Sequence, residues 1–157
     1  MKITKETIAV VGILATVTSF LGTLAIPVYL LVACNLIDYI TGIVASNNRG
    51  QRLSSYKGIS GIYKKVGMYL LIIVGVFVDI MIHYITSSVG WEIKVNYIVG
   101  CVVAIWLVLN EIISILENLN DVGTPMPPFL MPLVKMIKGQ VEDKAEEVIK
   151  DKEDETE

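Results

Sequence analysis

The segment from Thr7 to Asn47 constrains the fold of this chain more than any other, because Asp38 is its only side chain that carries a full charge at neutral pH. A helix crosses the hydrocarbon core of a bilayer with about 20 apolar residues, and this segment is about twice that long. It must therefore form one strongly tilted helix or two helices joined by a tight turn. Gly22 and Pro27 favour a turn, since proline removes a backbone hydrogen bond from a helix interior. Such a segment predicts an integral membrane protein.

Two more apolar segments follow, and 54% of the 157 residues are hydrophobic. We expect an all-α integral membrane fold in which residues 1–120 form a transmembrane helical domain. Its predicted helices cover about 7–25, 27–47, 63–86 and 95–118. The first of these helices is short and carries several hydroxyl side chains. Three transmembrane helices are therefore the alternative to four.

Residues 121–157 differ in composition from the rest of the chain. A proline-rich turn, DVGTPMPPFLMP, is expected to end the last transmembrane helix. Beyond it, apolar residues recur at helical spacing at Val134, Ile137, Val141, Ala145 and Val148. This pattern predicts an amphipathic helix over about 133–150 that lies in the cytoplasm or at the lipid headgroups. The acidic tail KEDETE is expected to be disordered.

The segment 46–65 is the basic part of the chain. It contains no acid, and its cations are Arg49, Arg52, Lys57, Lys64 and Lys65. Short cytoplasmic loops collect lysine and arginine, so this segment is predicted to be a loop on the cytoplasmic surface of the membrane. A short surface helix near 56–62 within this loop is left open. Lys2 and Lys5 place the N-terminus on the same side, which requires the first apolar segment to cross twice as a hairpin. Both termini are then cytoplasmic. If the first helix does not span, the N-terminus lies outside.

Polar side chains inside the apolar segments are the candidate functional residues. Asp38 shares a helical stripe with small or polar neighbours such as Cys34 and Gly42, and small residues let helices approach closely in a membrane. A charge at the bilayer centre costs about 2.5–3.5 kcal/mol on insertion scales, so such acids are expected to be sheltered by protein or water. The candidates for an oligomerisation surface or an aqueous lumen are Asp38, Thr41, Asp79, Asn110, Glu111, Ser114 and Glu117. Two other interpretations stay open, namely contacts within one protomer and a path for protons or cations.

No pattern in the sequence indicates catalysis or a bound cofactor. We find no nucleophile elbow, phosphate-binding loop or zinc-protease motif. Cys34 and Cys101 have no CxxC or histidine neighbour that would indicate zinc. The sequence also lacks the basic, aromatic surface that binds nucleic acid. We therefore expect no enzymatic activity, no catalytic residue, no cofactor, no metal and no nucleic-acid partner.

Four separated blocks of the sequence form a recognisable series between about residues 28 and 133. They are IDYITG with Asp38, Thr41 and Gly42, SSYKGISGIYKK with Lys64 and Lys65, the VD pair that ends in Asp79, and NEIISILENLNDVGTPMPPFL with Asn110, Glu111, Ser114 and Glu117. In order and spacing these blocks resemble the phage holin family that includes the clostridial toxin-secretion holin.

The resemblance implies a small protein, made late in phage infection, that accumulates in the bacterial inner membrane and then assembles into lesions. It implies a homo-oligomer whose partners are other copies, the lipid bilayer and, without direct contact, an endolysin that leaves through the lesions to cause host cell lysis. Some relatives release toxins instead. Holins have no active-site residues. The residues alone leave open a small oligomeric ion channel or transporter subunit, and a membrane accessory protein without permeation.

Overall fold

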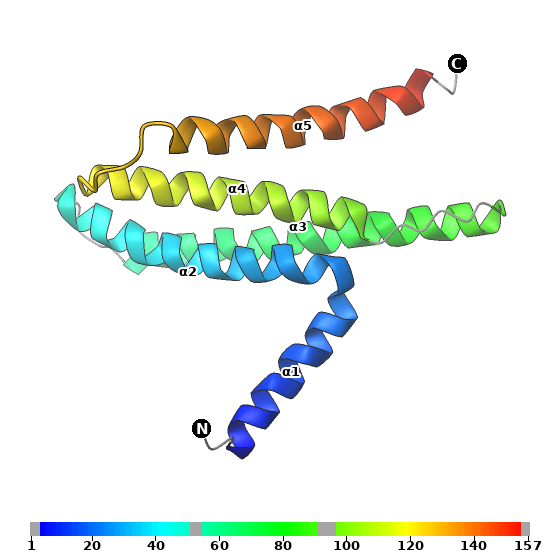
Figure 1. Ribbon diagram of the computed structural model, residues 1–157, viewed down its shortest axis with the longest axis horizontal. Coiled ribbons are helices and arrows are strands. Elements are labelled where there is room, and N and C mark those ends of the chain that lie inside the picture. The colour runs from blue at the N-terminus through cyan, green and yellow to red at the C-terminus, as the bar shows by residue number, and fades with distance from the viewer. Residues whose placement is uncertain (1–3, 51–54, 91–96, 155–157) are drawn as a thin grey trace.

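The computed structural model describes residues 4–50, 55–90 and 97–154, and the regular elements in these ranges are all helical. They are α1 (Lys5–Leu21), the 3-10 turn η1 (Gly22–Leu24), α2 (Ala25–Asn48), α3 (Ser55–Ser88), α4 (Ile98–Asp121) and α5 (Leu130–Asp154). Figure 1 shows α2, α3, α4 and α5 side by side, while α1 leaves this bundle at a steep angle. The predicted all-helical fold is confirmed for the described residues.

Helix α4 is central to the bundle, because it contacts α2, α3 and α5. It runs parallel to α2. Cys101 lies beside Thr23 at one end of the pair, and the side chain of Asn48 donates to the carbonyl of Asp121 at the other. Helices α3 and α5 run antiparallel to α4 (Figure 1). Three neighbours therefore decide the environment of α4.

Two clusters of buried apolar side chains hold the bundle together. The larger cluster joins η1, α2, α3 and α4 and contains Leu24, Leu31, Ile72, Ala104, Leu107 and Val108. The smaller cluster joins α4 to α5 through Leu109, Leu116 and Val134. Many other large apolar side chains are exposed, Phe20 and Ile26 among them. Helices that remain apolar on their outer faces are typical of membrane spans.

Three stretches of the described chain are long and apolar enough to cross a membrane, namely Val10–Asn48, Gly58–Ser88 and Ile98–Asp121. The first includes both α1 and α2, so four spans remain a prediction and three remain the alternative. Helices α2 and α4 are each about 36 Å long at 1.5 Å per residue, enough for a hydrocarbon core of about 30 Å. Helix α1, with 17 residues, is at the lower limit for a span.

The turn between α1 and α2 lies where the sequence predicts it, and α1 leaves this turn at an angle instead of packing along α2 (Figure 1). The chain turns at η1, and Pro27 falls in the first turn of α2, where its missing N–H leaves no helical hydrogen bond unmade. The hydroxyls of Thr18 and Tyr29 hydrogen-bond across the junction at 2.9 Å. Beyond it, α1 points away from α2 (Figure 1). An apolar helix needs no protein partner where lipid can cover it.

Helix α3 begins at Ser55 rather than near residue 63. The short surface helix that the sequence left open near 56–62 is therefore the first part of α3 and not a separate element in a loop. Local propensity is a weak prior, and most helical stability comes from tertiary packing. The acidic tail also differs from expectation. Helix α5 continues through Asp154, while residues 155–157 lie outside the described ranges.

Helices α3 and α4 approach closely where two glycines face each other. A Cβ atom on Gly75 would lie 3.0 Å from the Cα atom of Gly100, and one on Gly100 would lie 3.0 Å from a methyl group of Val76. Small residues at helix crossings allow such close approach in membrane proteins. The crossing brings the N-terminus of α4 against α3, within reach of Asp79.

Candidate functional site

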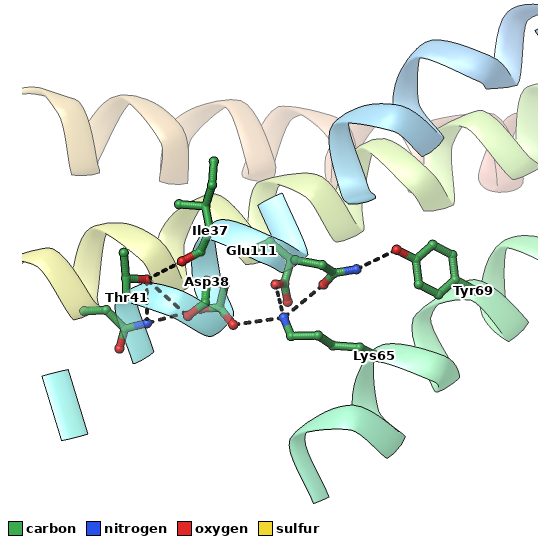
Figure 2. A network of polar contacts seen from close by, with 8 residues as sticks. Ile37, Asp38, Thr41, Lys65, Tyr69 and Glu111 are labelled. Carbon is green, nitrogen blue, oxygen red and sulfur yellow. Dashed lines mark hydrogen bonds and ion pairs between the residues drawn. The ribbon is translucent and has the colours of Figure 1, made fainter. Parts of the chain in front are cut away.

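Lys65 of α3 lies at the centre of a charged layer inside the bundle (Figure 2). Its Nζ donates to Oδ1 of Asn35 at 3.0 Å, to Oδ2 of Asp38 at 2.9 Å and to Oε2 of Glu111 at 2.6 Å. These four residues are called the Lys65 layer. The side chain of Glu111 is 6% exposed, that of Asp38 17% and that of Lys65 20%. One shielded cation on α3 thus joins α2 to α4.

Uncharged side chains complete the hydrogen bonds of the Lys65 layer. Asn35 Nδ2 donates to the hydroxyl of Tyr69 at 2.9 Å. Asn118 Nδ2 donates to Oδ1 of Asp38 at 3.2 Å and to Oγ1 of Thr41 at 3.4 Å. Among the described residues, no buried side-chain nitrogen or oxygen lacks a hydrogen-bond partner. The layer is therefore a closed polar network within one chain.

The local structure of α2 explains why its polar residues reach this network. Asn35, Asp38 and Gly42 are three and four residues apart, and this spacing places them on one face of a helix. That face meets α4, since a Cβ on Gly42 would lie 3.6 Å from Nδ2 of Asn118. A charge in hydrocarbon is costly, and an opposite charge with complete hydrogen bonding offsets much of the cost. Chemically, the Lys65 layer is a set of ion pairs and hydrogen bonds that links α2, α3 and α4.

Asp79 lies apart from the Lys65 layer and serves the N-terminus of α4. Its two carboxylate oxygens accept from the backbone N–H groups of Val99 and Gly100, each at 2.9 Å, and the residue is 2% exposed. The first N–H groups of a helix have no partner within the helix, and a carboxylate there also suits the helix dipole. An acid of α3 therefore caps α4, which explains its burial.

Three other predicted site residues of α4 lie outside the Lys65 layer. Asn110 and Ser114 are half-buried, and Glu117 is exposed. The structure thus brings Asp38, Thr41 and Glu111 into one network. Whether any of the predicted residues serves oligomerisation or a lumen remains a prediction.

The predicted basic surface loop separates into several environments. Arg49 forms an ion pair with the end of α4. Arg52 lies outside the described residues, Lys57 falls in the first turn of α3, and Lys64 is exposed. The prediction for Lys65 is wrong. The sequence predicts this side chain at the membrane surface, whereas the structure places it inside the bundle. Successive residues of a helix point about 100° apart, so Lys64 and Lys65 face different surroundings.

Sequence reasoning missed Lys65 as a counter-ion, although a signal was present. Acids enclosed by apolar helices require a cation or a dense set of hydrogen bonds. Lys65 precedes Tyr69 by four residues, so both share a helix face. Residues four apart share a face only in a helix. Because the segment 46–65 is predicted to be a loop, the shared face of Lys65 and Tyr69 does not follow from that prediction.

Long apolar helices that enclose the ion pairs of the Lys65 layer define an α-helical membrane protein with several spans. Comparison with protein families narrows this class. The model of the bacteriophage holin family matches residues 15–139, and the chain therefore belongs to that family. The match confirms the resemblance carried by the four sequence blocks. The family is generally non-enzymatic.

Several bacterial proteins are similar to this chain over most of its length. An uncharacterized protein of Halalkalibacterium halodurans is 32% identical over 82% of this chain and 90% of the relative. An uncharacterized protein of Listeria innocua is 30% identical over 92% of this chain and 94% of the relative. One of Clostridium perfringens is 30% identical over 77% and 87%, respectively. No solved structure matches the chain.

Proposed function

We propose that this protein is a holin. It accumulates as a multi-pass protein in the bacterial inner membrane, with both termini in the cytoplasm, and assembles into homo-oligomeric lesions through which an endolysin or a toxin leaves the cell. The observation that carries the proposal is membership of the holin family over residues 15–139, in a chain with three span-length apolar stretches in its described part. The activity requires no catalytic residue, metal or cofactor, and the endolysin need not touch the protein.

The Lys65 layer supports a protein that resides stably in lipid before it assembles. Its ion pairs are satisfied inside one chain, so a single copy can stay in the membrane without exposing them. The outer faces of α1, α2 and α3 remain apolar and are open to lipid or to other copies. Exchanging lipid for another copy on these faces places no new charge in hydrocarbon, so the exchange carries little electrostatic cost.

Charged side chains midway along α2 and α4 are also what a small ion channel would contain, so a channel is the second candidate. The size of the permeating molecule distinguishes the two functions. In vesicles that contain the purified protein, a holin releases an entrapped protein-sized dextran. Ion conductance without any release of dextran would support the channel and overturn the holin.

Inducible expression in a bacterium, with and without a cytoplasmic endolysin, tests the function in cells. We expect abrupt lysis after a delay when both proteins are present, because the endolysin reaches the peptidoglycan only through a lesion. Endolysin expressed alone is the control and should leave the cells intact. Growth without lysis when both proteins are made would refute the proposal.

We also propose that Asp38 and Glu111 stabilise the assembled state, and this role has a separate test. Asp38→Asn and Glu111→Gln each remove one carboxylate that contacts Lys65, and we expect both to change the time of lysis and the ladder of cross-linked oligomers. Glu117→Gln removes an exposed carboxylate of α4 outside the Lys65 layer, so comparison with it separates loss of a Lys65 contact from loss of any carboxylate on this helix. Unchanged timing and unchanged ladders in both variants would remove the assembly role.

A further inference from the structure

The C-terminal helix α5 lies along α4, which is long and apolar enough to span a membrane (Figure 1). The sequence predicts this helix in the cytoplasm or at the headgroups, whereas the structure packs it against a span. The turn between α4 and α5 lets the chain reverse its direction. Gly123 has a φ of 82°, and the N–H of Thr124 donates to the carbonyl of Leu119 at 3.0 Å. A left-handed glycine with this hydrogen bond is a common way to end a helix.

Apolar contacts and one polar junction hold α5 against α4. Val134 lies in one buried apolar cluster with Leu109 and Leu116 of α4. Farther along, the indole Nε1 of Trp106 donates to Oε1 of Glu142 at 2.6 Å, and Nζ of Lys138 lies 5.0 Å from the centre of the Trp106 ring. Lys138 also pairs with Glu142 at 3.6 Å. Trp106, Lys138 and Glu142 are called the Trp106 clasp.

The opposite face of α5 changes character along the helix. Its first half exposes the apolar residues Leu133, Met136 and Ile137 together with Lys135, whereas its second half exposes the charged residues Asp143, Lys144, Glu146 and Glu147. The side chains of Lys144 and Glu147 pair with each other and are 77% and 55% exposed, whereas that of Lys138 in the clasp is 25% exposed. In its docked position the second half of α5 therefore presents exposed charges beside the Trp106 region of α4, a helix long and apolar enough to span a membrane.

This charged face is incompatible with acyl chains. Charged side chains are strongly disfavoured in hydrocarbon, and those of the outer face of α5 point away from the bundle that could shelter them. The docked position consequently requires water on the outer side of α5. Inside a membrane, water lies beside a span only where the protein encloses an opening.

We infer that docked α5 lines the water-filled opening of the assembled protein, with its charged face toward the water and its apolar stripe and the Trp106 clasp on α4. The inference rests on the proposed function. In a protomer surrounded by lipid, α5 is undocked and lies at the membrane surface, where amphipathic helices bind. Docking of α5 on α4 thus accompanies assembly. Because α5 runs antiparallel to α4 (Figure 1), docking also carries the C-terminal end of α5 from the cytoplasmic surface toward the other end of the bundle.

The acids inside the spans are less suited to line such an opening. Asp38 and Glu111 point into the bundle toward Lys65, and Asp79 is bound to the first amides of α4. Turning them toward water would break these contacts. The charged face of α5 is already exposed, so it can meet water without any change inside the bundle.

The fluorescence of Trp106 tests the docking of α5 directly. In the variant Trp91→Phe, Trp106 is the single tryptophan of the chain. The full-length protein is placed in phosphatidylcholine vesicles with ordinary or brominated acyl chains at a series of protein-to-lipid ratios, and release of an entrapped dextran is recorded in the same samples. Bromine quenches a tryptophan that contacts acyl chains. We expect strong quenching in tight vesicles and severalfold weaker quenching in vesicles that release dextran, because docked α5 covers Trp106.

Lys138→Glu and Lys144→Glu are a matched pair, since both make the same charge change, one in the clasp and one on the outer face. We expect Lys138→Glu to keep Trp106 quenched and to lower dextran release severalfold, while Lys144→Glu behaves like the parent. Dextran release with Trp106 still fully quenched, or equal behaviour of the two variants, would overturn the lining and leave the proposed function intact. Absence of release by the parent at every ratio would overturn the proposed function and the lining with it.

Discussion

Lys65 is the residue on which the charged interior of this protein depends. Its ammonium contacts carboxylates on two different helices, Asp38 on α2 and Glu111 on α4. Both ion pairs are largely shielded from solvent, so they matter more than an exposed pair on a surface. Losing Lys65 would leave two enclosed carboxylates without their shared cation, which is more damaging than never having placed charges there.

We therefore expect Lys65→Met to lower the free energy of unfolding by about 3–5 kcal/mol, the usual cost of removing one partner from a buried ion pair. Methionine keeps a long apolar side chain, so the charge is the main loss. Unfolding of the purified protein by SDS added to a mild detergent measures the change. Lys64→Met, at an exposed neighbouring position, should change little.

Adding Glu111→Gln to Lys65→Met gives a further check on this interpretation. The double variant should recover part of the lost stability, because one uncompensated carboxylate is gone. Equal losses for Lys64→Met and Lys65→Met would show that the ion pairs do not stabilise the bundle.

At the scale of elements, α4 is stabilised by a different contribution from each neighbour. Helix α3 caps its first amides through Asp79 and neutralises Glu111 through Lys65, α2 contributes Leu31 to their shared apolar cluster, and α5 covers part of its apolar surface. The capping depends on the crossing of α3 and α4 at Gly75 and Gly100, where a side chain on either helix would separate the two backbones.

Two glycines of α3 allow a matched test of this crossing. A Cβ at Gly75 would lie 3.0 Å from the Cα of Gly100, and a backbone atom cannot move aside as the end of a side chain can. We expect Gly75→Ala to destabilise the protein by about 1–3 kcal/mol, as overpacking does. It should also speed hydrogen exchange at the amides of Val99 and Gly100, because α4 moves away from Asp79.

Gly67→Ala is the control, since no atom lies within 4 Å of the added Cβ and the residue is in the same helix. It should be neutral or stabilising by up to about 1 kcal/mol, because alanine favours helix more than glycine does. A similar loss of stability for both variants would mean that the α3–α4 crossing is not a tight contact.

At the scale of the whole molecule, basic residues mark one end of the bundle. Arg49 pairs with Asp121 where α2 and α4 end, and the part of α3 that precedes Lys65 runs toward the same end. Lysine and arginine collect on the cytoplasmic side of membrane proteins. We therefore expect the Arg49 end to face the cytoplasm and the end of α3 near Val89 to face outward.

Cysteine labelling checks this orientation. In a chain with Cys34→Ser and Cys101→Ser, an impermeant maleimide added to intact spheroplasts should label Val89→Cys and leave Asn48→Cys unlabelled. Both positions are exposed, and they lie at opposite ends of the bundle. Labelling of both after permeabilisation is the control for reactivity. The reverse pattern in intact spheroplasts would show that the bundle has the opposite orientation.

Some elements could be predicted closely and others could not, for physical reasons. The last span was predicted to within about one helical turn, because its length follows from the thickness of the bilayer. The face shared by Asn35 and Asp38 was also predictable, since helical periodicity decides which residues share a face. The start of α3 was missed, because its glycines and serines favour a loop locally and packing against other helices overrides that preference.

By itself, the sequence determined the class of this protein, because long apolar segments with few charges are stable only as helices in a membrane. Only the tertiary structure decided which groups meet across helices, namely Lys65 with Asp38 and Glu111, Asp79 with the first amides of α4, and α5 with α4. The physical reason is that periodicity defines the polar face of a helix, whereas the partner on that face depends on packing between segments distant in the chain.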